Sequence, residues 1–108
     1  MEASLEIASS TLIEPLLVRG AKGVETLNPN DILYIKSDGA YVEIKTKEKS
    51  IIQRKYIKDL MILLPNFFIR THRSYVVNSN HIEQRTGSTV IVDGQSIPIS
   101  KSYKESSK

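Results

Sequence analysis

Apolar and polar positions alternate most clearly at residues 41–46, where polar or amphipathic residues flank Val42 and Ile44. A period of two places successive side chains on opposite faces of a strand, so we expect both aliphatic residues to face a core. The neighbouring runs 31–36 and 50–52 are also rich in strand-forming residues. Together the three segments predict consecutive antiparallel strands.

Turn-forming residues separate these runs and several others. Asp38-Gly39, within a turn predicted at 37–40, supplies a position of positive φ at little cost. Asp93-Gly94 predicts a second tight hairpin turn. Pro98 confines its own strand, predicted at 95–99, to the edge or exit of a sheet. The remaining β-rich segments are 16–18, 24–27, 82–85, 89–92 and 95–99.

One helix is predicted, at about residues 55–64. Its apolar positions follow the spacing i, i+3, i+4, i+7 that places them on one face. They are Ile57, Leu60, Met61 and Leu64. Pro65-Asn66 ends the helix, because the residue before a proline disfavours helical conformation. Eight to ten short strands, one helix and no β-α-β crossover predict a mainly β, antiparallel domain with the helix packed against it.

The predicted start of this helix carries two cations, Arg54 and Lys55, and no Ser, Thr, Asp or Asn cap. Cations at the positive end of a helix dipole are unfavourable by roughly a few tenths of a kcal/mol each. An incoming phosphate would relieve both defects. An exposed basic helix end capped by water explains the same residues equally well.

Residues 67–78 place a polar tetrad, 71–74, between apolar flanks. Two phenylalanines and an isoleucine precede the tetrad and Tyr75-Val76-Val77 follows it, so strand-forming residues would anchor it in a core. The tetrad carries a fixed charge on Arg73 and a second possible charge on His72. A cationic, donor-rich turn on a rigid sheet suits recognition of an anion or of base edges.

Length and composition limit which kinds of protein the chain can be. The chain has 108 residues, enough for one domain, and no cysteine, which excludes disulfides and thiolate metal sites. No apolar run reaches the ~18 residues of a membrane-spanning helix, and the N-terminus lacks the features of a signal peptide. We expect a linker or a short helix left from an upstream domain at 1–14, one folded domain at 15–104 and a frayed tail at 105–108.

Charge is distributed unevenly along the chain. Residues 1–31 hold two basic and five acidic side chains, a net −3, whereas residues 32–108 hold thirteen basic and seven acidic, a net +6. A basic body favours a polyanionic partner. On charge alone, however, a solvated basic surface is the simpler explanation.

Four segments have a characteristic order and spacing. They are Asp31–Ile35 with Asp38–Val42, Leu63–Pro65 before Phe67–Arg70, His72–Asn78, and Ile97–Tyr103. Together they resemble the LytTR family of DNA-binding domains, which are output domains of many bacterial response regulators. His72–Asn78 is the most specific of them, and the resemblance runs from about Leu16 to Tyr103. It implies an elongated, mostly β fold of roughly ten strands that inserts loops, not a recognition helix, into successive major grooves of DNA.

The resemblance implies three DNA-facing segments. Arg73 is the sharpest base-reading candidate, since a guanidinium can bond guanine in bidentate fashion, worth about 1–3 kcal/mol of discrimination. Lys101 could act as a point-charge donor where several family members have arginine. The expected base-reading residues are Ala40, Tyr41, Arg73 and Lys101. The expected phosphate-binding residues are Arg54, Lys55, His72, Ser74, Asn80, Ser102 and Lys104.

Simpler roles exist for several of these residues. His72 could be a histidine that donates to a neighbouring carbonyl. Tyr41 could stack on a base or merely cover the sheet. Asn78 fits a turn-former better than a reader of bases.

The predicted function is sequence-specific binding of double-stranded DNA in transcription regulation, as the output domain of a two-component response regulator. The resemblance implies a bacterial cytoplasmic protein without a cofactor or a membrane, a homodimer on paired DNA repeats, and an upstream receiver domain for which 108 residues leave no room. An alternative is a protein-interaction module that uses an exposed β edge. An enzyme based on His72 and His81 is disfavoured, because no nucleophile elbow, metal-ligand cluster or glycine-rich phosphate loop accompanies them.

Overall fold

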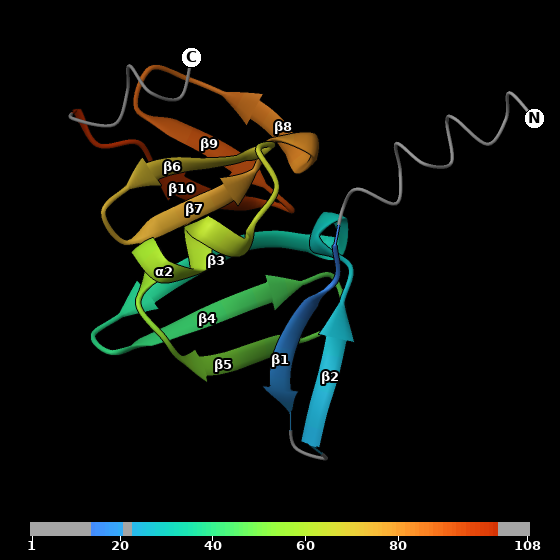
Figure 1. The fold of residues 1–108 in the computed structure, drawn as a ribbon. Helices are drawn as coiled ribbons and strands as arrows, with labels where there is room; N and C mark the ends of the chain where they lie inside the picture. Colours follow the sequence, from blue (N-terminus) through green and yellow to red (C-terminus); the bar gives the residue numbers. More distant parts are fainter. Residues whose placement is uncertain (1–13, 21–22, 102–108) are drawn as a thin grey trace, which may run out of the picture.

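The structure, a computed structural model, describes residues 14–20 and 23–101, which form ten strands, one α-helix and two single-turn 3-10 helices (Figure 1). The strands are β1 (Leu16–Gly20), β2 (Gly23–Leu27), β3 (Ile32–Asp38), β4 (Tyr41–Thr46), β5 (Ser50–Arg54), β6 (Phe68–His72), β7 (Tyr75–Asn78), β8 (Ile82–Arg85), β9 (Thr89–Val92) and β10 (Gln95–Pro98). The helices are α2 (Ile57–Leu63), η1 (Pro29–Asp31) and η2 (Ser79–His81). The predicted mainly β domain is confirmed.

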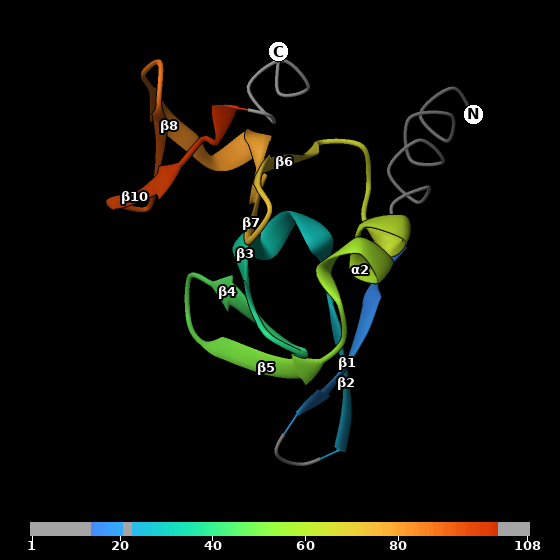
Figure 2. The ribbon, with the colours of Figure 1, turned by 90° about the vertical axis from the view of Figure 1, so that its left-hand side faces the viewer.

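The strands form three antiparallel sheets. A five-stranded sheet has the order β5-β4-β3-β7-β6, a three-stranded sheet the order β10-β9-β8, and β1 pairs with β2 alone. The three-stranded sheet lies at one end of the five-stranded sheet and the β1–β2 hairpin at the other (Figures 1 and 2). The principal-axis extents of 45 × 35 × 24 Å agree with the expected elongated shape.

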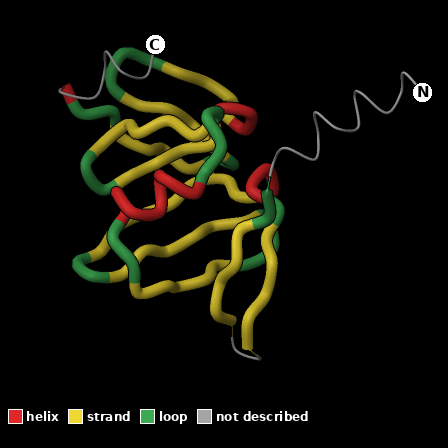
Figure 3. Tube along the Cα trace, viewed as in Figure 1, coloured by secondary structure: helices red, strands yellow, loops and turns green. Residues whose placement is uncertain are grey.

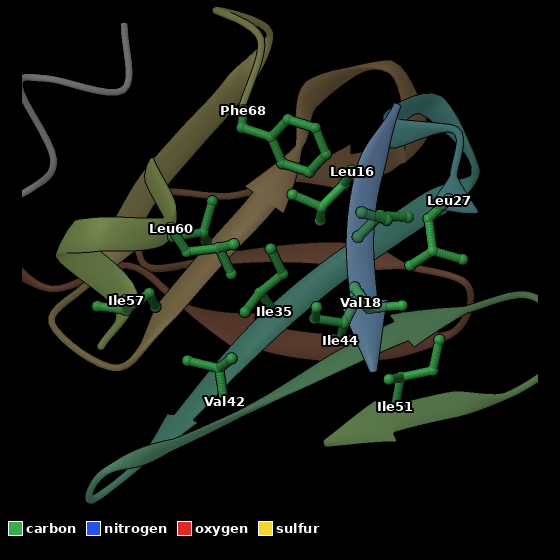
Figure 4. Packing of buried hydrophobic residues seen from close by; sticks show 12 residues of the cluster. Leu16, Val18, Leu27, Ile35, Val42, Ile44, Ile51, Ile57, Leu60 and Phe68 are labelled. Atoms are coloured by element: carbon green, nitrogen blue, oxygen red, sulfur yellow. The ribbon is translucent and has the colours of Figure 1, made fainter. Parts of the chain in front are cut away.

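The first core lies between the five-stranded sheet, the β1–β2 hairpin and α2 (Figure 4). Val42 and Ile44 contribute from β4 and have no exposed surface, which confirms the face predicted from their alternation. Leu16 and Val18 reach the same cluster from β1, and Leu60 reaches it from α2. Burial of such aliphatic side chains stabilises the fold by roughly 1.5–3 kcal/mol each.

A second core lies on the other face of β3 and β7, against the three-stranded sheet. Its buried members are Leu33, Val77, Val90, Val92, Ile97 and Ile99. A register shift between Ile32 and Tyr34 in the β3–β4 pairing allows the consecutive Leu33 and Tyr34 both to pack on this side. Burial, followed by the nearby charge of Glu43, raises the pKa of Tyr34 above its ordinary value.

Two predicted turns and one edge strand are confirmed. Asp93 and Gly94 have φ angles of 51° and 77°, as a tight hairpin turn between β9 and β10 requires. Gly39 has φ 64° in the turn between β3 and β4. Pro98 ends β10, which is an edge strand of its sheet.

Strands extend further than the sequence pattern suggested. Asp38 still pairs with Tyr41, so β3 runs through residues expected to be a turn, and Gly39-Ala40 alone reverse the chain. Likewise, Arg54 pairs with Tyr41 in β5, although it was expected at the start of the helix. Cross-strand pairing holds these residues extended, which no local propensity reveals.

The helix is correspondingly shorter than predicted. It begins at Ile57, and the preceding Tyr56 makes no side-chain cap hydrogen bond. Leu64 is extended, with φ −92° and ψ 148°, because it precedes Pro65. The predicted apolar face is confirmed: Ile57 and Leu60 are buried, and Met61 and Leu64 pack against the first core.

Candidate nucleic-acid interface

The pairing directions bring three connecting segments to one edge of the molecule. Gly39-Ala40 joins β3 to β4, and Arg73-Ser74 joins β6 to β7. Because β3 pairs antiparallel with both β4 and β7, the end of β3 lies beside the starts of β4 and β7. The two turns that precede β4 and β7 therefore lie at the same end of the strands of the five-stranded sheet. Ser100-Lys101, which follows β10, also lies there (Figures 1 and 3). We call the edge formed by these three segments the turn edge.

Backbone hydrogen bonds tie these segments to the strands of their neighbours. The Ser37 N–H, at the end of β3, donates to the Ser74 carbonyl at 2.8 Å. The Ser100 N–H donates to the Thr71 carbonyl at 2.7 Å, which fastens the C-terminal segment to β6. The turn edge is therefore one connected surface, and its loops are supported by sheet.

The polar tetrad is divided between strand and turn. Thr71 and His72 belong to β6, and only Arg73 and Ser74 turn. Thr71 is 1% exposed, and its hydroxyl has no hydrogen-bond partner within the described residues. Arg73 is exposed at the tip, where a guanidinium can reach a ligand.

His72 is fixed by the turn itself. The Ser74 N–H donates to His72 Nδ1 at 3.0 Å, and the ring lies edge-on to Tyr75 with centroids 5.9 Å apart. Because Nδ1 accepts, the neutral ring carries its proton on Nε2. His72 thus accepts from a backbone amide, in contrast to the expected donation to a carbonyl, and Nε2–H is left as a donor.

The first turn and the end of β5 form a second cationic group. Ala40, Arg54, Lys55, Tyr56 and Asp59 line a shallow surface pocket. Tyr41, directly opposite Arg54 in the sheet, is 48% exposed. The structure therefore brings together four residues expected from separate arguments: Ala40, Tyr41, Arg54 and Lys55. β5 and its exit, not a helix end, position both cations.

The remaining predicted residues divide into three cases. Lys101 is exposed on the turn edge. Ser102 and Lys104 lie outside the described residues. Asn80, by contrast, lies in η2 at the far end of β7, where its Nδ2 donates to Asn30 Oδ1 at 3.1 Å. The structure does not bring Asn80 to the turn edge.

The two histidines are also separated by β7. His81 Nε2 lies 2.7 Å from the Asn30 carbonyl, at the edge opposite His72. The geometry therefore does not assemble the acid–base pair that a ribonuclease-like reaction would need. Within the described residues, no group of three or more histidines and carboxylates could hold a metal ion. In the same part of the chain, no helix is long and apolar enough to cross a membrane.

Charge follows the same division between the two edges. The basic side chains on or beside the turn edge are Arg54, Lys55, Arg70, Arg73 and Lys101, against the acidic Asp38 and Asp59. The acidic side chains near the opposite edge are Glu25, Asp31, Glu48, Glu83 and Asp93, against the basic Lys45, Lys47 and Lys49. Lys49 Nζ bonds Glu25 Oε1 at 2.8 Å, which further offsets its charge. The described residues thus present a positive turn edge.

Arg70 belongs to this site but was not singled out from the sequence. Its Nε donates to the His72 carbonyl at 3.0 Å, and its Nη2 donates to the Arg73 carbonyl at 2.7 Å. Its position in β6, just before a cationic turn, carries no sequence signal for this contact.

Comparison with known families decides the assignment. The LytTr DNA-binding domain model matches residues 22–108. The chain belongs to the LytTR family. The LytTr DNA-binding domain of a Bacillus cereus protein described as a methyl-accepting/DNA response regulator superposes with a TM-score of 0.73 at 26% sequence identity, covering 85% of this chain and 91% of that domain. The resemblance and the fold expected from it are confirmed.

Curated relatives of this LytTR domain are longer proteins. The sensory transduction protein LytT of Bacillus subtilis is 29% identical over 94 residues, which cover 81% of this chain and 39% of LytT. LytT of Bacillus anthracis is 27% identical over 94 residues, which cover 81% of this chain and 38% of that protein. The chain therefore spans less than half the length of these relatives. Family membership makes it a DNA-binding domain.

Proposed function

We propose that this LytTR domain binds double-stranded DNA in a sequence-specific manner and regulates transcription, as the output domain of a two-component response regulator in the bacterial cytoplasm. The turn edge carries the proposal. It brings together two exposed turns and the Lys101 segment, backbone hydrogen bonds tie β3 to Ser74 and Ser100 to β6, and positive charge is concentrated there. Loops held by sheets suit insertion into successive major grooves, since each loop keeps its position relative to the others.

In this proposal Arg73 reads a guanine through its O6 and N7 atoms, and Lys101 donates to a neighbouring base edge. The Ala40–Tyr41 turn makes the third base contact. Phosphates are held by the residues that surround these readers: Arg54, Lys55, His72 through Nε2–H, Ser74, Ser102 and Lys104. Asn80 is left out, because it lies at the opposite edge.

Two partners complete the proposal. A second copy binds the neighbouring half of a paired DNA repeat, so that the two domains form a homodimer on DNA. A receiver domain, in the part of a longer protein that this chain does not cover, controls the pairing. The share of LytT that the chain spans leaves room for such a domain.

The test is selection from a randomised pool of duplex DNA, followed by binding measurements across a salt series, with wild type and Arg73→Ala. We expect wild type to enrich a repeated motif and to lose affinity steeply with salt. Arg73→Ala should lose preference at one position of each repeat and bind the selected duplex about 5- to 150-fold more weakly, the factor that corresponds to one bidentate base contact.

Lys47→Ala is the matched control, since Lys47 is an exposed cation near the opposite edge. It should retain the wild-type motif and affinity. If no motif is enriched and both variants behave like wild type, the domain is not a sequence-specific reader. A protein-interaction module that uses an exposed β edge would then be the better explanation.

A further inference from the structure

The Arg70 side chain folds back over the turn that follows its own strand. Nε donates to the His72 carbonyl at 3.0 Å and Nη2 to the Arg73 carbonyl at 2.7 Å. The planar guanidinium thus bonds two consecutive carbonyl groups with its fork of donors. Both carbonyls belong to the segment that presents Arg73.

An irregularity in the hairpin explains why this segment needs support. The β6–β7 pairing passes from Arg70 opposite Val76 to His72 opposite Tyr75, so Thr71 is an extra residue in β6. Such a bulge interrupts the ladder of backbone hydrogen bonds and redirects the chain beyond it. Backbone carbonyls near an interrupted ladder need partners: the Ser100 N–H bonds that of Thr71, and Arg70 bonds the next two.

The same turn is held from its other side. The Ser74 N–H donates to His72 Nδ1 at 3.0 Å, and the Ser74 carbonyl accepts from the Ser37 N–H at 2.8 Å. Together with the two Arg70 bonds, these contacts fix the peptide groups on both sides of Arg73. The direction in which the exposed Arg73 side chain leaves the turn is thereby set before any ligand binds.

We propose that Arg70 is a positioning residue for DNA recognition: it holds the Arg73-Ser74 turn in its base-reading conformation. The inference rests on the proposed function and deepens it. Preorganisation of this kind raises affinity, because the cost of ordering the turn is not incurred on binding. A lysine at position 70 keeps the charge but cannot bond two carbonyls through a planar fork, so it separates positioning from charge.

The experiment compares wild type, Arg70→Lys and Arg70→Gln in binding to the selected duplex across a salt series. Arg54→Gln serves as the reference for a lost phosphate contact. We expect both Arg70 variants to bind about tenfold more weakly, with the salt slope of wild type. Their base preference should weaken most at the position that Arg73→Ala loses. In the free protein, amide hydrogen exchange at Arg73 and Ser74 should accelerate, with thermal unfolding still cooperative.

Specific outcomes overturn the inference. If Arg70→Lys binds like wild type while Arg70→Gln loses about 0.9 from the salt slope, Arg70 contacts a phosphate directly. If Arg70→Gln does not fold, Arg70→Lys alone still tests whether Arg70 has the positioning role. If wild type itself enriches no DNA motif, the proposed function fails and this inference fails with it. If wild type is specific and Arg70→Lys equals it in affinity and exchange, only the positioning role is refuted.

Discussion

At the scale of single residues, Asn78 shows how one buried amide joins distant parts of the chain. It has no exposed surface. Its Nδ2 donates to the Ile32 carbonyl at 2.9 Å, and its Oδ1 accepts from the Asn80 N–H at 2.8 Å. The side chain therefore caps η2 and at the same time ties β7 to the start of β3.

Asn78→Ala should lower the free energy of unfolding by about 2–4 kcal/mol, because it leaves a buried carbonyl and a helix-start N–H without partners. Urea denaturation followed by circular dichroism measures the change. Asn80→Ala is the matched control, since Asn80 is exposed and its Nδ2 donates to Asn30 Oδ1 at 3.1 Å. It should cost less than about 1 kcal/mol. Equal losses in the two variants would refute a special role for Asn78.

Asn78 also shows which contacts of a single residue can be predicted from the sequence and which cannot. Its turn-forming role could be predicted, since an asparagine that bonds its own backbone two residues on is a local device. Its partner Ile32 lies 46 residues away along the chain, and no local sequence pattern predicts that contact. The Arg70 contacts were missed for a similar reason. They depend on the extra residue at Thr71, a bulge set by pairing with β7.

At the scale of elements, α2 is a short helix held by packing and not by its ends. It has seven residues and no side-chain cap at Tyr56. An isolated helix of this length would be unstable in water. Its apolar face against the first core therefore supplies its stability, as the spacing of four apolar residues predicted.

Leu60→Ala should destabilise the protein by about 2–4 kcal/mol, since Leu60 is 3% exposed and its truncation leaves a cavity in the first core. Ile62→Ala, two positions further along the same helix, should stay within about 0.5 kcal/mol, because Ile62 is 80% exposed. Thermal or urea unfolding of the two variants makes the comparison. Similar losses would mean that α2 does not pack as described.

The ends of elements were harder to predict than their faces. The alternation of Val42 and Ile44 and the helical spacing of Ile57 and Leu60 identified buried faces directly. The boundary between β5 and α2 was displaced, because Arg54 stays extended through its pairing with Tyr41. Propensity around Arg54 carries no information about that partner strand.

At the scale of the whole molecule, the fold separates charge that the chain carries in mixed order. Lys47 and Arg54 are seven residues apart in sequence, yet β5 places them at opposite edges. Acidic residues gather around Lys47, whereas Arg54 lies beside Lys55 and the Ala40 turn. Net charge alone predicted a basic body, but its orientation required the sheet topology.

This separation makes the salt dependence of DNA binding sensitive to position as well as to charge. Arg54→Gln should reduce the slope of log affinity against log salt by about 0.9, the value for one lost phosphate contact on duplex DNA. Lys47→Gln removes the same charge from the opposite edge and should leave the slope unchanged. Fluorescence anisotropy with the selected duplex at several salt concentrations measures both.

If the two variants lost equal slope, DNA would be attracted by diffuse charge and not docked on the turn edge, and Arg73 would have no fixed base to read. A reduced salt slope in Arg54→Gln alone would show that the turn edge faces DNA. Arg73 and Lys101 would then lie against the duplex, since backbone hydrogen bonds hold their segments on the same edge.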